Sequence, residues 1–163
     1  MRLTNLPVLI FALLTSTARV LAQTPAAASQ APPHLTVAGH INVTSYKPQP
    51  YPSTDGFTLA ATDIIEDFSG DFSGTGTSHL LVATESATGS MHFTGMERFS
   101  GSLGKASGSF LFQNSGTLVN GVLHSTWHII PGSGTGALAG IRGEGGCNPQ
   151  GCHLDYWFPA PGS

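Results

Sequence analysis

Short apolar and β-branched runs alternate with glycine-rich turns along the chain, most regularly between Gly95 and Gly146. The turns recur at intervals of about 8–12 residues, which is typical of an all-β barrel or sandwich. Because closing such a sheet leaves no open edge, the pattern predicts a single closed or nearly closed antiparallel β-barrel of seven or eight strands. Strands are predicted over residues 35–46, 57–68, 69–84, 91–99, 107–113, 122–130 and 153–158, with 138–142 as either a strand or a helical turn.

The connections between these runs carry their own signals. Residues 47–56 contain three prolines, and proline disrupts the pairing of a strand, so an irregular crossing is predicted there. Two signals compete for the hairpin that follows residue 113, namely Asn114-Ser115-Gly116 and Asn120-Gly121. Asn-Gly is the strongest hairpin dipeptide, but the sequence leaves both positions open.

The N-terminal part is predicted to lie outside the folded domain. Residues 1–22 have the pattern of a secretory signal peptide, with Arg2 at the start and an apolar core over residues 6–14. That core is shorter than the about 20 residues that a membrane helix needs, which favours a cleaved signal over an anchor. Residues 23–33 hold three prolines and no large apolar side chain, so a disordered tether is predicted. The β-barrel domain is expected over residues 34–159, and the protein is expected to be secreted or periplasmic.

The charge balance narrows the choice of partners. Cleavage of the signal would remove Arg2 and Arg19 from the six strong bases, leaving four against nine carboxylates and a formal charge of −5 with the histidines neutral. A base-poor surface argues against binding of nucleic acid, which needs clustered lysine and arginine. It also argues against docking on anionic lipid, so no membrane contact is expected after signal cleavage.

Cys147 and Cys152 are the only cysteines and flank a turn-rich tetrapeptide. In an oxidising compartment they are predicted to form a disulfide that closes a short hairpin and contributes about 2 kcal/mol. The alternatives are a redox pair or a metal clip that includes His153. Redox motifs usually space the cysteines by two residues, and a zinc site needs four ligands. The structural disulfide is therefore favoured, and neither a metal nor a cofactor is expected.

Three motifs in the second half of the chain occur in a fixed order, at residues 95–98 (Gly-Met-Glu-Arg), 108–110 (Gly-Ser-Phe) and 131–143. With these motifs the chain after the tether closely resembles a family of small bacterial and fungal proteins known only as a domain of unknown function. The resemblance implies a barrel like that of allene oxide cyclase, which dirigent proteins share, and no established activity. Members of that family often lack a signal peptide and the cysteine pair, so the predicted export departs from the family.

Glu97 is the candidate for acid–base chemistry. Neighbouring strand residues face opposite ways, so Glu97 and Arg98 cannot both point inward without a bulge. If Glu97 faces the interior, it shares that face with Met91 and Phe93, and such apolar surroundings would raise its pKa and suit it to act as a general acid or base. The alternative, which is the more common outcome, is a structural ion pair or a buried carboxylate that accepts hydrogen bonds from backbone N–H groups.

Other familiar chemistry is weakly supported. His124 and His128 share one face of a predicted strand but would lie about 13 Å apart, too far to bind one metal together. The glycine-rich segment at residues 132–136 lacks the Lys-Ser/Thr that completes a phosphate-binding loop. No serine lies in a Gly-x-Ser-x-Gly nucleophile elbow with a plausible order of triad partners.

Three functions follow from these observations. The first is the binding of a small hydrophobic molecule in the barrel. The second is a cofactor-free isomerase or cyclase, which the resemblance suggests through the fold alone, with Glu97 as its catalytic group. The third is a secreted protein that forms homo-oligomers through its barrel wall. The sequence ranks them in this order and leaves open whether the protein is an enzyme. The residues expected to line a binding site are Met91, Phe93, Phe110, Phe112 and Trp127.

Overall fold

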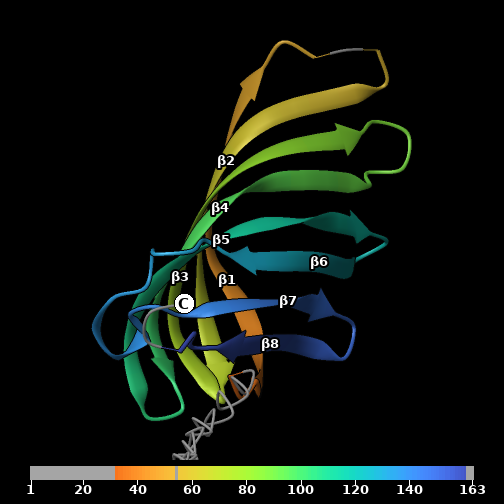
Figure 1. Cartoon of the computed structure of the whole chain (residues 1–163). Helices are drawn as coiled ribbons and strands as arrows, with labels where there is room; N and C mark the ends of the chain where they lie inside the picture. The colour runs from red at the N-terminus through yellow and green to blue at the C-terminus, as the bar shows by residue number, and fades with distance from the viewer. Residues whose placement is uncertain (1–31, 54, 161–163) are drawn as a thin grey trace, which may run out of the picture. The chain divides into compact units, whose positions relative to one another are not determined.

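The computed structural model describes residues 32–53 and 55–160, so the predicted signal peptide and most of the predicted tether lie outside the described residues. The rest forms a closed ring of eight antiparallel strands, hydrogen bonded in chain order, in which the last strand pairs with the first (Figure 1). This confirms the predicted all-β barrel. The strands are β1 (Leu35–Tyr51), β2 (Phe57–Gly70), β3 (Phe72–Glu85), β4 (Met91–Leu103), β5 (Ala106–Val119), β6 (Val122–Ile129), β7 (Arg142–Asn148) and β8 (Gly151–Trp157), with one short 3-10 helix, η1 (Gly136–Leu138).

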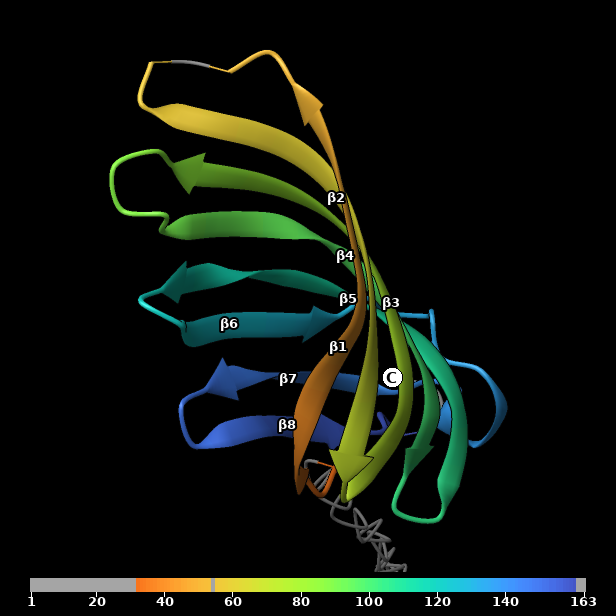
Figure 2. The ribbon, with the colours of Figure 1, turned by 180° about the vertical axis from the view of Figure 1, so that it is seen from behind.

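The two ends of the barrel differ. The β1–β2, β3–β4, β5–β6 and β7–β8 turns all lie at one end, here called the hairpin end, which is on the right in Figure 1 and on the left in Figure 2. The opposite end carries the β2–β3 and β4–β5 turns and the long β6–β7 connection with η1. Leu138 of η1 and Ile141 after it are fully buried there, so the connection closes the barrel at this end, which we call the packed end.

Six aromatic side chains fill the interior near the packed end. Neighbouring rings in this group have centroids 5.1 to 6.4 Å apart, mostly in tilted or edge-to-face arrangements, the geometry that aromatic pairs prefer. They come from β2–β6, where alternation of the strand residues turns every second side chain inward. This aromatic core consists of Phe68, Phe72, Phe99, Phe110, Phe112 and Trp127.

The segment predicted as an irregular crossing is in part a strand, because β1 continues to Tyr51. Pro48 and Pro50 are paired in register with Thr62 and Ala60 of β2. On its other side β1 pairs with β8 only from Leu35 to Gly39, so the prolines lie on an open edge. A proline is tolerated at such an edge because its missing N–H would not face a partner strand.

The predicted end of the fifth strand was also wrong. Strand β5 runs through Asn114 to Val119, and the hairpin turn is at Asn120-Gly121, where both residues have positive φ angles of 52° and 78°. That conformation is the one that makes Asn-Gly the preferred hairpin dipeptide. Asn114 is therefore an interior strand residue and not a turn residue.

The seventh predicted element is divided in the structure. Helix η1 takes up the start of the predicted segment 138–142, and a strand not predicted from the sequence, β7, begins at Arg142. β7 contains three glycines, which have low strand propensity, so its sequence gives a weak strand signal. Its pairing with β8 supplies what its own propensity lacks.

Candidate functional site

A cavity of about 250 Å³ lies between the aromatic core and the hairpin end. Its walls are mostly aliphatic and aromatic, because the inward positions of six strands carry such residues there. Val43 and Tyr46 line it while remaining half exposed, so the cavity reaches solvent beside the open edge of β1. The apolar lining consists of Ile41, Val43, Tyr46, Ile64, Leu80, Val82, Met91, Phe93, Leu118, Leu123 and Trp127.

Polar side chains form a layer between these walls and the aromatic core. Along β2, Glu66 lies between the inward residues Ile64 and Phe68. Along β5, Asn114 is the inward residue next to Phe112, on the side of Phe112 that faces the hairpin end. The members that line the cavity are Glu66, Ser78, Asn114 and Ser125. The cavity thus has apolar walls and a polar floor. We call these four residues, together with Glu97, the polar layer.

Two carboxyl groups meet in this layer. Glu66 on β2 is 6% exposed and Glu97 on β4 is 1% exposed. Their strands are not neighbours, because β3 lies between them. They approach each other over Gly76 of β3, where an added Cβ would overlap Oε1 of Glu97 and stand 3.0 Å from Cγ of Glu66. The absence of a side chain at Gly76 therefore makes the carboxyl pair possible.

The environment of the pair holds a proton on Glu66. Burial, followed by the charge of Glu97 and a hydrogen bond to it, raises the pKa of Glu66 to about 9. Burial also raises the pKa of Glu97, while hydrogen bonds from Glu66, Ser78 and Asn114 act in the opposite direction. The three hydrogen bonds favour the charged form of Glu97. Glu66 is therefore the carboxyl of the pair that keeps its proton at neutral pH, and Glu97 is the first of the two to ionise.

Hydrogen bonding in the layer is incomplete. The amide Nδ2 of Asn114 donates to Oε2 of Glu97 at 3.0 Å, but Oδ1 of the same amide has no partner within the described part of the chain. The indole Nε1 of Trp127 is likewise buried without a partner there. Oε1 of Glu97 is also buried without a hydrogen-bond partner in the described part of the chain. Buried polar groups without partners cost about 1–3 kcal/mol each, so the layer favours a bound polar group.

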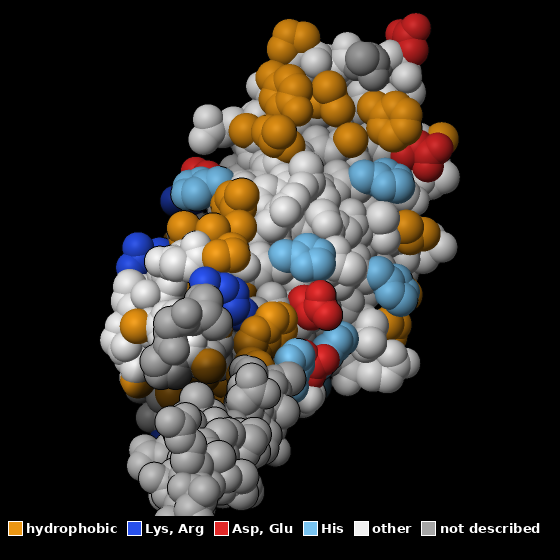
Figure 3. Space-filling view, in the orientation of Figure 1, with side chains coloured by type: hydrophobic (Ala, Val, Ile, Leu, Met, Phe, Trp, Pro, Cys, Tyr) orange, Lys and Arg blue, Asp and Glu red, His pale blue; other side chains and the backbone are white. Residues whose placement is uncertain are grey.

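Of the residues that the structure describes, no basic side chain lines the cavity. Among residues 32–53 and 55–160, the ion pairs are His79 with Asp63 at 2.6 Å and His128 with Glu144 at 3.9 Å. All four side chains are exposed on the outer wall, where histidine and acidic side chains lie together (Figure 3). Among the described residues, the buried carboxyl pair therefore has no cationic side chain beside it.

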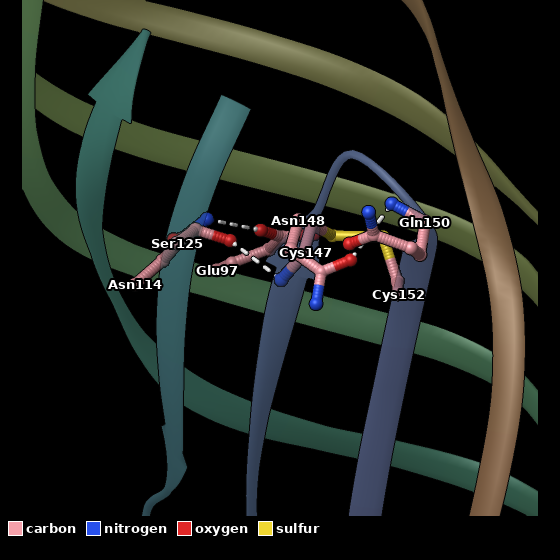
Figure 4. The surroundings of a disulfide bond; sticks show 7 residues. All are labelled: Glu97, Asn114, Ser125, Cys147, Asn148, Gln150 and Cys152. Atoms are coloured by element: carbon pink, nitrogen blue, oxygen red, sulfur yellow. Dashed lines mark hydrogen bonds between the residues drawn. A yellow bond between two sulfur atoms is a disulfide. The ribbon is translucent and has the colours of Figure 1, made fainter. Parts of the chain in front are cut away.

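The disulfide hairpin lies beside the site. Cys147 and Cys152 are register partners in β7 and β8 and form the predicted disulfide. The N–H of Cys147 donates to Oγ of Ser125, a cavity residue, at 3.1 Å (Figure 4). β6 and β7 share only two paired positions, so this hydrogen bond extends the contact between the hairpin and the cavity wall.

The residues expected to line a binding site divide into two groups. Met91, Phe93 and Trp127 line the cavity. Phe110 and Phe112 face inward as well, but they are buried in the aromatic core and are not among the lining residues.

Glu97 faces the interior as expected, and Arg98 faces outward. Glu97 forms no ion pair, and its hydrogen bonds come from side chains, Asn114 among them. Glu97 does not line the cavity, whereas Glu66 does.

Sequence reasoning missed Glu66, Ser78 and Asn114. The signal that could have found Glu66 is its position two residues from both Ile64 and Phe68, which puts all three on one face of the strand. Ser78 is a small polar residue in a serine- and glycine-rich strand and carries no such signal. Asn114 was one of the two positions left open for the hairpin turn, so it was not considered as an interior residue.

Two searches for common features of function are negative for the described ranges. Within residues 32–53 and 55–160, no three side chains of His, Cys, Asp or Glu are grouped so that they could hold a metal ion. In the same ranges no helix has the length and hydropathy needed to cross a membrane.

Comparison with known proteins identifies relatives of the chain. The family model DUF3224, described as a protein of unknown function, matches residues 37–159. Among solved structures, the chain is similar to a DUF3224 protein of unknown function from Shewanella oneidensis MR-1, whose crystal structure was determined at 1.84 Å resolution. The two are 22% identical over 78% of this chain and 100% of that chain, with a TM-score of 0.64, which shows a common fold. No curated protein matches the chain.

Proposed function

Because the chain belongs to the DUF3224 family of proteins of unknown function, we propose a function from the cavity itself, namely that the protein binds a small hydrophobic molecule inside its barrel. The observation that carries this proposal is a cavity of about 250 Å³ with predominantly apolar walls and a route to solvent at Val43 and Tyr46. An engineered apolar cavity of about 150 Å³ binds benzene, so this one has room for a ring with a short substituent.

The two methionines of β4 provide a test. The Met91 methyl group belongs to a cavity residue, whereas Met96 lies on the outer wall and is 49% exposed. Titration of the full chain with 2-phenylethanol, followed by carbon-labelled methionine NMR, should shift the Met91 signal saturably and leave Met96 in place. Leu80→Trp, which fills the cavity, should abolish the shift. Leu81→Trp, at a position 55% exposed on the outer wall, is the matched control. Equal shifts of both methionines would disprove binding in the cavity.

Export is part of the proposal. The disulfide and the predicted signal over residues 1–22 support a secreted or periplasmic location, because disulfides persist in oxidising compartments. Sequencing of the protein recovered outside the cytoplasm should give Gln23 as its first residue. An N-terminus at Met1 would contradict the cleaved signal and the domain boundary drawn from it.

A second candidate is a cofactor-free isomerase or cyclase, as the resemblance to the allene oxide cyclase barrel suggests. The carboxyl pair favours it, since two coupled carboxyls that share one proton can give and take back a proton. In this arrangement Glu66, which reaches the cavity, is the group that would touch substrate, and Glu97 would act through it. Glu66→Gln should then abolish turnover of a substrate found by product analysis, while Glu144→Gln on the outer wall should not. Unchanged turnover in Glu66→Gln would exclude this mechanism.

A further inference from the structure

We infer that the ligand of this cavity is a small aromatic or aliphatic amine, whose positively charged ammonium group lies in the polar layer against Glu66 and Asn114. The inference rests on the proposed function and specifies its ligand class. Three features of the site carry it, which are the unbalanced charge, the surplus of hydrogen-bond acceptors and the aromatic wall.

The charge comes first. Glu66 and Glu97 bury two carboxyl groups side by side, ionisation of Glu97 places a negative charge there, and no lysine, arginine or histidine lines the cavity or pairs with them within the described ranges. A buried ion without a partner is costly, and a partner of opposite charge with good hydrogen bonds offsets that cost. An ammonium group supplies both, whereas a carboxylate ligand would add a second negative charge to the same site.

The hydrogen-bonding pattern points the same way. Asn114 is 8% exposed and lines the cavity, and its Nδ2 donates to Glu97 while Oδ1 has no donor among the described residues. Glu66 also lines the cavity, and a protonated carboxyl keeps a carbonyl oxygen that can accept a hydrogen bond. An ammonium group has three donors and no acceptor, so it matches the oxygens of the floor, and the indole Nε1 of Trp127 keeps no acceptor from it. The unpartnered Oδ1 of Asn114 is an observation independent of the acidic pair.

The walls suit the rest of an amine. Phe93 and Trp127 both line the cavity, and tryptophan is the best aromatic partner for a nearby cation. The apolar lining near the hairpin end is suited to a ring or a short alkyl chain. A molecule with an ammonium at one end and a single ring at the other fits the order of polar floor and apolar wall.

Three probes of one shape separate the possibilities. Calorimetric titration of the full chain near neutral pH would compare 2-phenylethylamine, 2-phenylethanol and 3-phenylpropionate. The amine should bind about ten-fold tighter than the alcohol, since charge-assisted hydrogen bonds are roughly twice as strong as neutral ones. The carboxylate should bind more weakly than the alcohol. Glu97→Gln, which removes the carboxyl that ionises first, should reduce the amine to the affinity of the alcohol, and Glu144→Gln should leave the preference intact.

Each result decides something. If the alcohol binds as tightly as the amine to the native chain, or if the carboxylate binds best, the inference is wrong while binding in the cavity stands. If none of the three binds, the proposed function fails for ligands of this size and the inference fails with it. The comparison on the native chain needs no variant, so a misfolded Glu97→Gln protein would not remove the test. A preference for the amine that survives in folded Glu97→Gln would also overturn the assignment.

Discussion

Glu66 and Glu97 meet inside the barrel although their strands are not neighbours, and Gly76 on the strand between them has no side chain to keep them apart. A lone glycine in the middle of a strand usually weakens it. Here the glycine allows the carboxyls to approach across β3 and builds the polar layer. The carboxyl pair thus depends on a third position as much as on its own two residues.

Gly76→Ala should lower the free energy of unfolding by about 1–3 kcal/mol, the usual cost of overpacking a well-packed interior. The new methyl group would overlap Oε1 of Glu97 and stand 2.7 Å from Cε2 of Phe68. Urea unfolding would measure the change, with Thr77→Ala on the outer wall of β3 as the control.

The cost should shrink when the overlap is removed. In a chain that carries Glu97→Ala, the Gly76→Ala substitution has no carboxyl oxygen to displace, so the two changes should be non-additive. Equal costs in both backgrounds would show that Gly76 is required for another reason, such as its contact with Phe68 alone.

Stability should fall as pH rises above the ordinary glutamate range. The pKa of Glu66 is about 9 in the folded chain against 4.5 as its ordinary value, so the folded state binds more protons than the unfolded state between these values. The stabilisation is complete below the lower pKa and is lost progressively up to the higher one. The slope is at most about 1.4 kcal/mol per pH unit for one proton. Urea unfolding at several pH values would measure it.

Glu66→Gln is the variant that tests the origin of this slope. Glutamine keeps the size of the side chain and does not titrate, so the variant should lose most of the decline toward high pH. Glu144→Gln, at an exposed position on the outer wall, should keep the native decline. A native slope in the Glu66→Gln protein would assign the pH dependence to a different group.

The barrel could be predicted from the sequence because its signals are local. Apolar runs with turns at regular intervals determine strands, and Asn120-Gly121 marks a hairpin with a defined backbone conformation. β7 was missed because its glycines give no strand signal and its pairing with β8 is a tertiary effect. The two prolines in β1 misled for a related reason, since only the closure of the barrel shows that they lie on an open edge.

The candidate site could be predicted only in part. Alternation along β4 correctly places Glu97 with Met91 and Phe93 on the inner face. Alternation does not show which inward side chains are packed against other side chains and which line a cavity. Phe112 could therefore not be separated from the cavity residues. The partner of Glu97 was beyond reach too, because Glu66 lies two strands away and their approach depends on register.

Asn114→Asp should destabilise the chain strongly, by about 3 kcal/mol or more, because it replaces the amide donor to Glu97 with a third carboxyl in the polar layer. The loss should be greatest at high pH, where the added carboxyl and Glu66 both tend to ionise. Thermal unfolding across a range of pH would measure it. Gln113→Glu adds the same charge at the neighbouring, exposed position of β5 and should change stability little. Similar losses in both variants would mean that overall charge, and not the layer, is responsible.

Removing the disulfide should cost about 2 kcal/mol, as expected for a loop of this length. Cys147 and Cys152 join β7 to β8 at the hairpin end, where β7 has few paired positions with β6. The Cys147→Ser/Cys152→Ser protein should therefore unfold at a lower urea concentration, and a reductant should lower the native chain to about the same midpoint. Reductant should have no effect on the double variant, which serves as the control.

Because the N–H of Cys147 donates to Ser125 in the cavity wall, the variant should also bind 2-phenylethanol more weakly. Unchanged binding with reduced stability would show that the hairpin supports the barrel without shaping its cavity.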